Sequence, residues 1–274
     1  MWSDRLTSKE ADRTQWAINE LSTVPWAKPL LLRLERAGGL KSENMSLMFE
    51  VRFAHELYRA GVSAEYEYPA GVGDSTVEFR TNTSPPWLIE LVSVRTSNAA
   101  KRAIRQTGLI YEQLLAPTRE DPARSEEAEM ITAEQKIGEK AFADGKPTKF
   151  PSITNSLHMI LTDIRGYLDE GGDIFDYRQM VYGVSGIPAE YSWMVHYWQG
   201  RPIKGLFEKD NPLHAAQYLQ ERIHFLGFVR ERYFHEGEIR EIAYYLANPH
   251  LFQNQEAAGD AFMSYPLAER KKAT

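Results

Sequence analysis

The chain reads FEVRFAHEL at residues 49–57, DSTVEFR at 74–80 and WLIEL at 87–91, and these three stretches decide its fold. In the first stretch apolar residues recur at the spacing of a helix, and Glu50 lies among them. The other two stretches are rich in strand-forming residues, and each carries an acid, Glu78 or Glu90, beside hydrophobic neighbours. Residues 82–86 are of turn-forming types, so we expect a β-hairpin that brings the two acids together.

The faces of the two strands follow from their alternation. Successive side chains of a strand point to opposite sides, so Glu90 shares a face with Val92. By the same rule Glu78 lies on the face opposite Val77 and Phe79. Pairing across the turn can then bring the two carboxylates side by side.

These acids form a candidate site for a divalent cation, in which Glu78 or Asp74 is the first acid and Glu90 the second. Asp74 shares the face of Glu78 only if the strand begins as early as residue 74. Two neighbouring carboxylates repel each other, and each has a raised pKa unless a cation joins them. Mg²⁺ commonly takes one or two carboxylates together with water and phosphate oxygens. The hairpin therefore predicts a site for Mg²⁺ or Mn²⁺, with ligands drawn from Asp74, Glu78 and Glu90, that activates water against a phosphodiester.

Glu90 is the acid that most needs a partner, because hydrophobic residues surround it in the sequence. A buried carboxylate without a partner costs several kcal/mol. The partner is either a metal ion or one of three arginines, Arg52, Arg80 and Arg95. For Glu50, a solvated position on the helix surface remains an alternative.

The composition is that of an ordinary globular protein. Of the 274 residues, 43% are hydrophobic and 26% are charged, which is unlike a disordered chain. Cysteine is absent, which excludes disulfides, thiolate metal sites and cysteine nucleophiles. No apolar run approaches the ~20 residues that span a bilayer, and residues 1–5 lack the character of a signal peptide. We therefore expect a cytoplasmic protein with no membrane partner.

The charge of the chain argues against tight, nonspecific binding of nucleic acids. The formal net charge is −6, whereas neutralisation of phosphates supplies most of such affinity. A local basic segment nevertheless follows the Glu90 strand, with Arg95, Lys101 and Arg105. Lys101 and Arg105 are four residues apart, so on a helix they share a face. These three residues are the candidates for contacts with DNA phosphates, and an ordinary solvated surface is the alternative.

The N-terminal part is predicted to be helical. Residues 3–37 are amphipathic, with breaks near Pro25 and Pro29. The next helix covers roughly 43–60, and Gly61 ends it.

The rest of the chain alternates between strands and helices. We expect an antiparallel meander first, because short turns join its strands, and the last of these strands is apolar enough to be buried on both faces. The predicted strands are 64–69, 75–81, 87–94, 157–163, 191–198 and 223–233. The predicted helices are 97–116, 126–144, 211–222 and 237–247, with an irregular insertion at 169–190.

This series predicts an α/β fold, a three-layer α/β sandwich with a central mixed sheet and additional helices. We divide the chain into an N-terminal helical extension at 1–42, an α/β domain at 43–252 and a C-terminal tail at 253–274.

The ordered acids on a helix and a hairpin resemble the PD-(D/E)xK, or restriction-endonuclease-like, superfamily of nucleases. The resemblance implies an αβββαβ core over about 43–163, and Mg²⁺-dependent cleavage of DNA. It places the catalytic helix glutamate of the family at Glu50, its first strand acid at Glu78 or Asp74, and its second at Glu90.

The sequence departs from the family pattern in two places. Val92 stands where the family has lysine, and no proline precedes the first acid. Because lysines migrate within this superfamily, the resemblance leaves Lys101, Lys136 and Lys140 on the following helices as substitutes.

Three hypotheses follow for the function. The first is a metal-dependent endonuclease, and the second is a catalytically inactive member of the same fold that binds nucleic acid or protein. The third is an unrelated α/β protein in which the acids form salt bridges. Aromatic residues further along the chain either stack on bases, pack in the core or form an oligomer interface such as that of a homodimer; they are Trp193, Tyr197 and Trp198.

Overall fold

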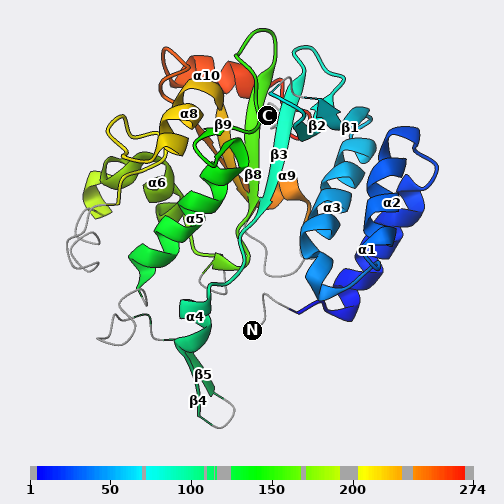
Figure 1. The fold of residues 1–274 in the computed structure, drawn as a ribbon, viewed down its shortest axis with the longest axis horizontal. Coiled ribbons are helices and arrows are strands. Elements are labelled where there is room, and N and C mark those ends of the chain that lie inside the picture. Colours follow the sequence, from blue (N-terminus) through cyan, green and yellow to red (C-terminus); the bar gives the residue numbers. More distant parts are fainter. Residues whose placement is uncertain are drawn as a thin grey trace, which may run out of the picture.

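The computed structural model describes residues 5–69, 72–107, 110–113, 115, 125–167, 171–191, 203–229 and 237–268, with the backbone alone at 104–107 and 110–113. Its centre is one six-stranded sheet in the order β1-β2-β3-β8-β9-β10 (Figure 1). The strands are β1 (Ala64–Pro69), β2 (Thr76–Thr81), β3 (Trp87–Ser93), β8 (Leu157–Asp163), β9 (Phe225–Val229) and β10 (Ala243–Ala247).

The sheet is mixed, as the sequence predicts. β1, β2 and β3 form an antiparallel meander, because short connections join them. β3, β8 and β9 are parallel to one another, and β10 returns antiparallel to β9. Parallel neighbours need long crossovers, and here the crossovers contain the helices that cover one face of the sheet.

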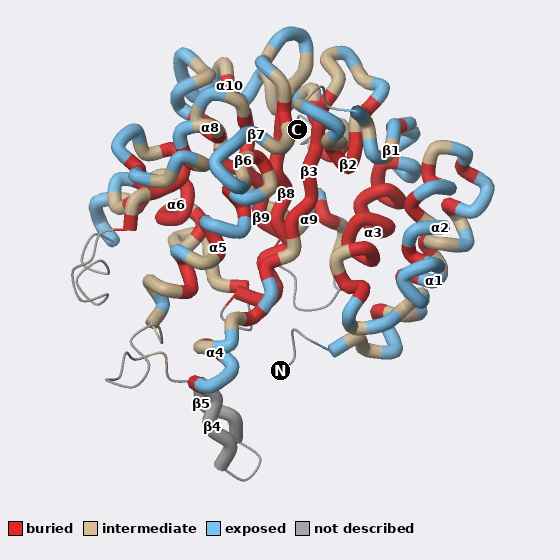
Figure 2. Tube along the Cα trace, viewed as in Figure 1, coloured by how far each residue is buried: buried red, intermediate tan, exposed pale blue. Residues whose placement is uncertain are grey.

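Two hydrophobic cores lie on opposite faces of the sheet, so the fold is an α/β sandwich of three layers (Figure 2). Helices α1 (Ser8–Leu21), α2 (Lys28–Arg36) and α3 (Met45–Arg59) supply the first core, together with residues after α10 (Gln255–Phe262). The second core is supplied by α5 (Glu126–Ala141), α6 (Ile174–Tyr182) and α8 (His214–Arg222). We refer to the two sides as the α3 face and the α5 face. Among the described residues, no helix combines the length and apolar character needed to cross a membrane.

α3 is the helix that the opening stretch predicts, and it is the most deeply buried one of its face. Its residues from Leu47 to Leu57 are all buried, including the acid Glu50. The chain leaves this helix at Gly61, whose φ of +73° is a left-handed conformation that favours glycine. α3 therefore holds Glu50 rigidly against the sheet.

The N-terminal segment packs as part of the same core rather than standing apart. α1 begins with a capping box between Thr7 and Glu10, and a 3₁₀ turn at Pro25–Ala27 separates it from α2. The predicted break near the prolines is thus confirmed. A second 3₁₀ turn, Ser42–Asn44, leads directly into α3.

The helix predicted at 97–116 is wrong beyond its first turn. α4 covers only Asn98–Arg102, and an antiparallel hairpin of β4 (Ile104–Thr107) and β5 (Ile110–Gln113) follows and projects from the body (Figure 1). β-Branched residues in this stretch, Ile104, Thr107 and Ile110, favour strands over a long helix.

The prediction for 237–247 is also wrong. α9 is a single turn, Ile239–Ile242, and the residues after it form β10 beside β9. Tyr244 and Tyr245 suit a strand, and the open edge of β9 supplies the hydrogen-bond partners that a helix would otherwise find within itself.

Two further segments differ from their predictions. The stretch 169–190, predicted to be irregular, contains α6, which begins with a capping box between Asp173 and Asp176. Two 3₁₀ turns, Gly183–Gly186 and Ala189–Tyr191, follow it. The predicted tail contains α10, and Tyr265 and Leu267 behind it are buried in the core. Of the predicted strand 191–198, only residue 191 belongs to the described residues. Trp193, Tyr197 and Trp198 lie outside them.

Candidate active site

Three glutamates lie in one row across the first three strands, and the row coincides with a break in the sheet. The pairing of β1 with β2 joins Tyr66 to Phe79 and Tyr68 to Val77, and it skips the step between them. The residues at the skipped position are Glu67 on β1 and Glu78 on β2. β2 and β3 pair Arg80 with Leu88 and Phe79 with Ile89. If this register is continued by one residue on each strand, Glu78 lies opposite Glu90.

A left-handed residue accompanies the break. Glu67 has a φ of +52°, a conformation that is uncommon for residues other than glycine. Tyr66 and Tyr68 then pack on opposite faces of the sheet, and so do their partners Phe79 and Val77. The prediction that Val77 and Phe79 share a face is therefore wrong, because the local twist cancels the usual alternation.

The side chains of Glu78 and Glu90 take over hydrogen bonds that the sheet gives up at this point. The Glu78 N–H donates to Glu90 Oε2 at 3.3 Å, and the Leu91 N–H donates to Glu78 Oε2. Each carboxylate thus accepts a backbone proton from the opposite strand. The hairpin acids are brought together, as the sequence predicts.

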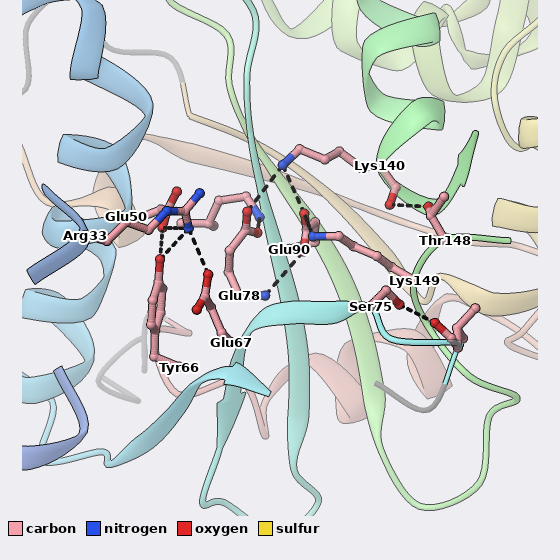
Figure 3. A network of polar contacts seen from close by, with 12 residues as sticks. Arg33, Glu50, Tyr66, Glu67, Ser75, Glu78, Glu90, Lys140, Thr148 and Lys149 are labelled. Carbon is pink, nitrogen blue, oxygen red and sulfur yellow. Dashed lines mark hydrogen bonds and ion pairs between the residues drawn. The ribbon is translucent and has the colours of Figure 1, made fainter. Parts of the chain in front are cut away.

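Two lysines meet this pair of acids from the α5 face (Figure 3). Lys140, in the last turn of α5, places its Nζ 3.0 Å from Glu90 Oε1 and 3.3 Å from Glu78 Oε1. Lys149, from the loop after α5, forms an ion pair with the same Oε1 of Glu90. The Glu90 side chain is fully buried, so both ammonium groups compensate a charge that water cannot reach.

Glu50 approaches the row from the α3 face. Its Oε2 accepts a hydrogen bond from Tyr66 Oη at 2.6 Å and lies 3.4 Å from Arg33 Nη1. The same guanidinium nitrogen donates to Tyr66 Oη at 2.6 Å and to Glu67 Oε1 at 3.3 Å. The site therefore consists of two neighbouring groups of carboxylates and cations, one on each face of the sheet (Figure 3), and the charges of Glu78 and Lys140 act on Glu50 between them.

Burial and repulsion by a neighbouring carboxylate raise the pKa values of Glu50 and Glu90. Burial, and then the charge of Glu78, raise the pKa of Glu90 to about 8 against the effect of the two lysines. The same two causes raise the pKa of Glu50 to about 7, against the effect of Tyr66 and Arg33. Although burial of Lys140 acts to lower it, the two strand carboxylates raise the pKa of Lys140, so this group remains an ammonium.

Of the two candidates for the first strand acid, Glu78 lies beside Glu90, whereas Asp74 lies apart from the cluster. β2 begins at Thr76, so Asp74 lies in the preceding turn, where it is exposed. No hydrogen bond or ion pair described in the structure joins Asp74 to the Glu78–Glu90 pair.

The arginines that were one alternative for the partner of Glu90 are engaged elsewhere, so that alternative is wrong, whereas a metal ion as the partner stays a prediction. Arg80 forms an ion pair with Glu65, and Arg52 lies beside Glu56. The guanidinium of Arg95 donates to the carbonyl of Glu43 at 2.8 Å. Each arginine lies outside the row, and lysines from the α5 side reach Glu90 instead.

The residues proposed for phosphate contacts lie at the far end of β3. Arg95 and Lys101 line a cavity of about 220 Å³ together with the start of α3 and the carboxyl ends of β3 and β8. Both side chains are exposed. The side chain of Arg105 lies outside the described residues.

The donor set of the Glu78–Glu90 pair fits a hard divalent cation. Among the described residues, no group of three or more His, Cys, Asp or Glu side chains is arranged to hold a metal ion by itself. Mg²⁺, however, commonly takes only one or two carboxylates and completes its shell with water and phosphate. Glu78 and Glu90 are two such carboxylates, and their Oε1 atoms already share one cationic group, Lys140.

Sequence reasoning found the acids but only part of their surroundings. Lys140 is one of the three lysines that the resemblance leaves as substitutes, whereas Lys136 pairs with exposed Glu139. Lys149, Arg33 and Tyr66 were missed. Only the Tyr66 position carries a signal in the sequence, since it alternates with acids on a predicted strand.

Comparison of the chain with protein-family models, with curated proteins and with solved structures found no match. The class of protein is therefore defined by the fold and the site themselves: a mixed α/β sandwich with a buried cluster of glutamates and lysines at a break in its sheet.

Proposed function

We propose that the protein is a metal-dependent nuclease that hydrolyses DNA phosphodiesters at the Glu78–Glu90 pair. One observation carries the proposal: two carboxylates from neighbouring strands converge on the single ammonium of Lys140 at a break in the sheet. Oxygen ligands for a hard cation and a fixed positive charge for a phosphate are what metal-assisted hydrolysis requires.

The order of elements supports the same proposal. α3, β1, β2, β3, α5 and β8 follow one another as helix, three strands, helix and strand, which is the αβββαβ order of the restriction-endonuclease-like core. The small strands β4, β5, β6 (Phe142–Ala143) and β7 (Lys146–Pro147) lie outside the central sheet, as additions to that order. Glu50, Glu78 and Glu90 occupy its helix and hairpin positions.

Each residue of the cluster has a role in this proposal. Mg²⁺ or Mn²⁺ held by Glu78 and Glu90 would polarise the phosphodiester and lower the pKa of an attacking water. Glu50 can accept and release a proton near neutral pH, because its pKa is raised to about 7. Lys140 supplies the positive charge that Val92 cannot, and as an ammonium it stabilises negative charge on the phosphate.

DNA is the substrate class that the surroundings favour. Arg95 and Lys101 follow the far end of the strand that carries Glu90, where both line one cavity, and their charges suit backbone phosphates. Because the net charge of the protein is −6, we expect its affinity for DNA to be modest and to fall with added salt.

A second candidate function rests on a specific observation. Two ammonium groups, those of Lys140 and Lys149, compensate the charge of Glu90. Such a closed ion-pair cluster also suits a catalytically inactive member of the fold that binds nucleic acid or protein. Cation binding at Glu90 separates the two functions.

The proposal is tested by a pair of matched variants in the first strand acid. We expect the purified protein to nick supercoiled DNA with Mg²⁺ or Mn²⁺, and Glu78→Gln to lower that rate by roughly 10²-fold or more, because one oxygen ligand loses its charge. Asp74→Asn, an equal change of charge on an exposed turn, is the control and is expected to retain the rate. Equal rates for wild type and Glu78→Gln would contradict the assignment.

A further inference from the structure

Two ammonium groups share one carboxylate oxygen in the cluster, and they are held in different ways. Lys140 Nζ bridges Glu78 and Glu90, at 3.3 and 3.0 Å. Lys149 contacts Glu90, which is the only carboxylate that the structure describes at its ammonium. Loss of the Glu90 contact would therefore leave Lys140 with a partner and Lys149 without a carboxylate.

The backbone that carries Lys149 is fixed on both sides. The Thr148 N–H donates to the carbonyl of Ala141 at 2.9 Å. Tyr218 Oη donates to the carbonyls of Lys149 and Phe150, at 3.0 and 2.5 Å. Only the four-carbon side chain of the lysine is then free to move, and such a flexible stem can shift its charge without moving the loop.

The next residue holds this loop in an unusual conformation. Phe150 has a φ of +63°, a left-handed conformation that strains the backbone of a residue with a side chain of this size. Its ring is fully buried in the core of the α5 face, and that packing offsets the strain. Backbone strain maintained by packing in this way clusters at functional sites. Here it directs the chain so that Lys149 reaches Glu90.

We propose that Lys149 is a second phosphate-contacting lysine, which occupies Glu90 in the free protein and leaves it for the substrate when a divalent cation binds there. This inference rests on the proposed function, because it takes Glu78 and Glu90 as the ligands of the cation. An ammonium and a divalent cation at the same oxygen repel each other, so one must withdraw. Lys149 withdraws because Lys140 retains Glu78.

The charge of Lys149 should oppose binding of the cation in a measurable way. Removal of the ammonium takes away both its repulsion of a divalent ion and its occupation of Glu90 Oε1. The net effect of the removal is therefore tighter binding of the cation. A lysine with a purely structural role would give the opposite result, since its loss would loosen the site.

The test measures Mn²⁺ affinity by calorimetry without DNA, and affinity for a short DNA duplex by fluorescence anisotropy with and without Ca²⁺. For Lys149→Met we expect Mn²⁺ to bind roughly tenfold more tightly than to wild type. With Ca²⁺ present, the variant should bind DNA less tightly, with a salt slope smaller by about 1. Without Ca²⁺ it should match wild type, because Lys149 is then held by Glu90. Lys146→Met, a change of an exposed lysine three residues earlier in β7, is the control and should match wild type throughout.

The experiment distinguishes a failure of the role proposed for Lys149 from a failure of the proposed function. If wild type binds Mn²⁺ and Glu90→Gln does not, the metal site stands. Unchanged or weaker Mn²⁺ binding by Lys149→Met then overturns the role of Lys149 alone. If wild type binds no Mn²⁺, or binds it equally well with Gln at position 90, the proposed function fails and this inference fails with it.

Discussion

Substitution of Glu90 by Gln is expected to abolish metal-dependent cleavage of DNA, with a loss of roughly 10³-fold or more in rate. Gln has the shape of Glu but no negative charge, so it cannot replace a carboxylate ligand of a hard cation. The amide oxygen can still accept the hydrogen bond that Glu78 N–H gives to position 90. The variant should therefore fold, and loss of activity reports on charge rather than on the sheet.

The control for this prediction is Glu65→Gln on β1. Glu65 is also a strand acid with a basic partner, Arg80, but its side chain is half exposed. Nicking of supercoiled plasmid should be unaffected by this change, and circular dichroism should give the same fold for both variants. Cleavage by Glu90→Gln at the rate of wild type would rule out Glu90 as a ligand.

Substitution of Glu134 by Gln is expected to stabilise the protein increasingly as the pH rises. Glu134 lies on α5 with 2% of its surface exposed, and its Oε1 has no hydrogen-bond partner among the described residues. Burial, and then the charge of Glu208, raise the pKa of Glu134 to about 9. The folded protein therefore keeps this proton where the unfolded chain, with a pKa of 4.5, releases it.

The direction of the pH dependence follows from linkage. The stability that protonated Glu134 contributes is present in full below the unfolded pKa and is lost as the pH rises through the folded pKa. An amide does not titrate, so Glu134→Gln escapes this loss. From one pKa unit per 1.36 kcal/mol, its advantage in free energy of unfolding should grow by about 4 kcal/mol between about pH 5 and about pH 8.

Urea unfolding of both proteins at the two pH values measures this change. The comparison across pH cancels any constant cost of fitting an amide into the site. Glu139→Gln is the control on the same helix, because Glu139 is exposed and paired with Lys136. A difference between Glu134→Gln and wild type that stays constant with pH would contradict the buried, protonated state of Glu134.

The fold could be predicted wherever local patterns agree with local structure. The helical spacing of 43–60 and the strands 64–69 and 157–163 lie close to the observed elements, because periodicity and end signals act within one segment. The predictions failed at 97–116 and 237–247, where pairing between segments outweighs helical pattern. β10 is a strand because the edge of β9 is beside it, which no local window records.

In the candidate site, too, the local part could be predicted from the sequence and the long-range part could not. The pairing of Glu78 with Glu90 depends on the turn and on the register of one hairpin, both of which are local. The cations do not follow from local rules. Lys140 and Lys149 reach Glu90 from α5 and its following loop, and Arg33 reaches Glu50 from α2.

The sequence by itself determined that two hairpin acids come together on a mixed α/β sheet and that another acid lies on the helix before them, because helix and strand periods act over a few residues. The tertiary structure alone decided what compensates them. The layer packed on the α5 face brings two lysines to Glu90, and the break at Glu67 opens the sheet there. Long-range packing sets the distance between charges far apart in sequence, and that distance decides their pKa values and their chemistry.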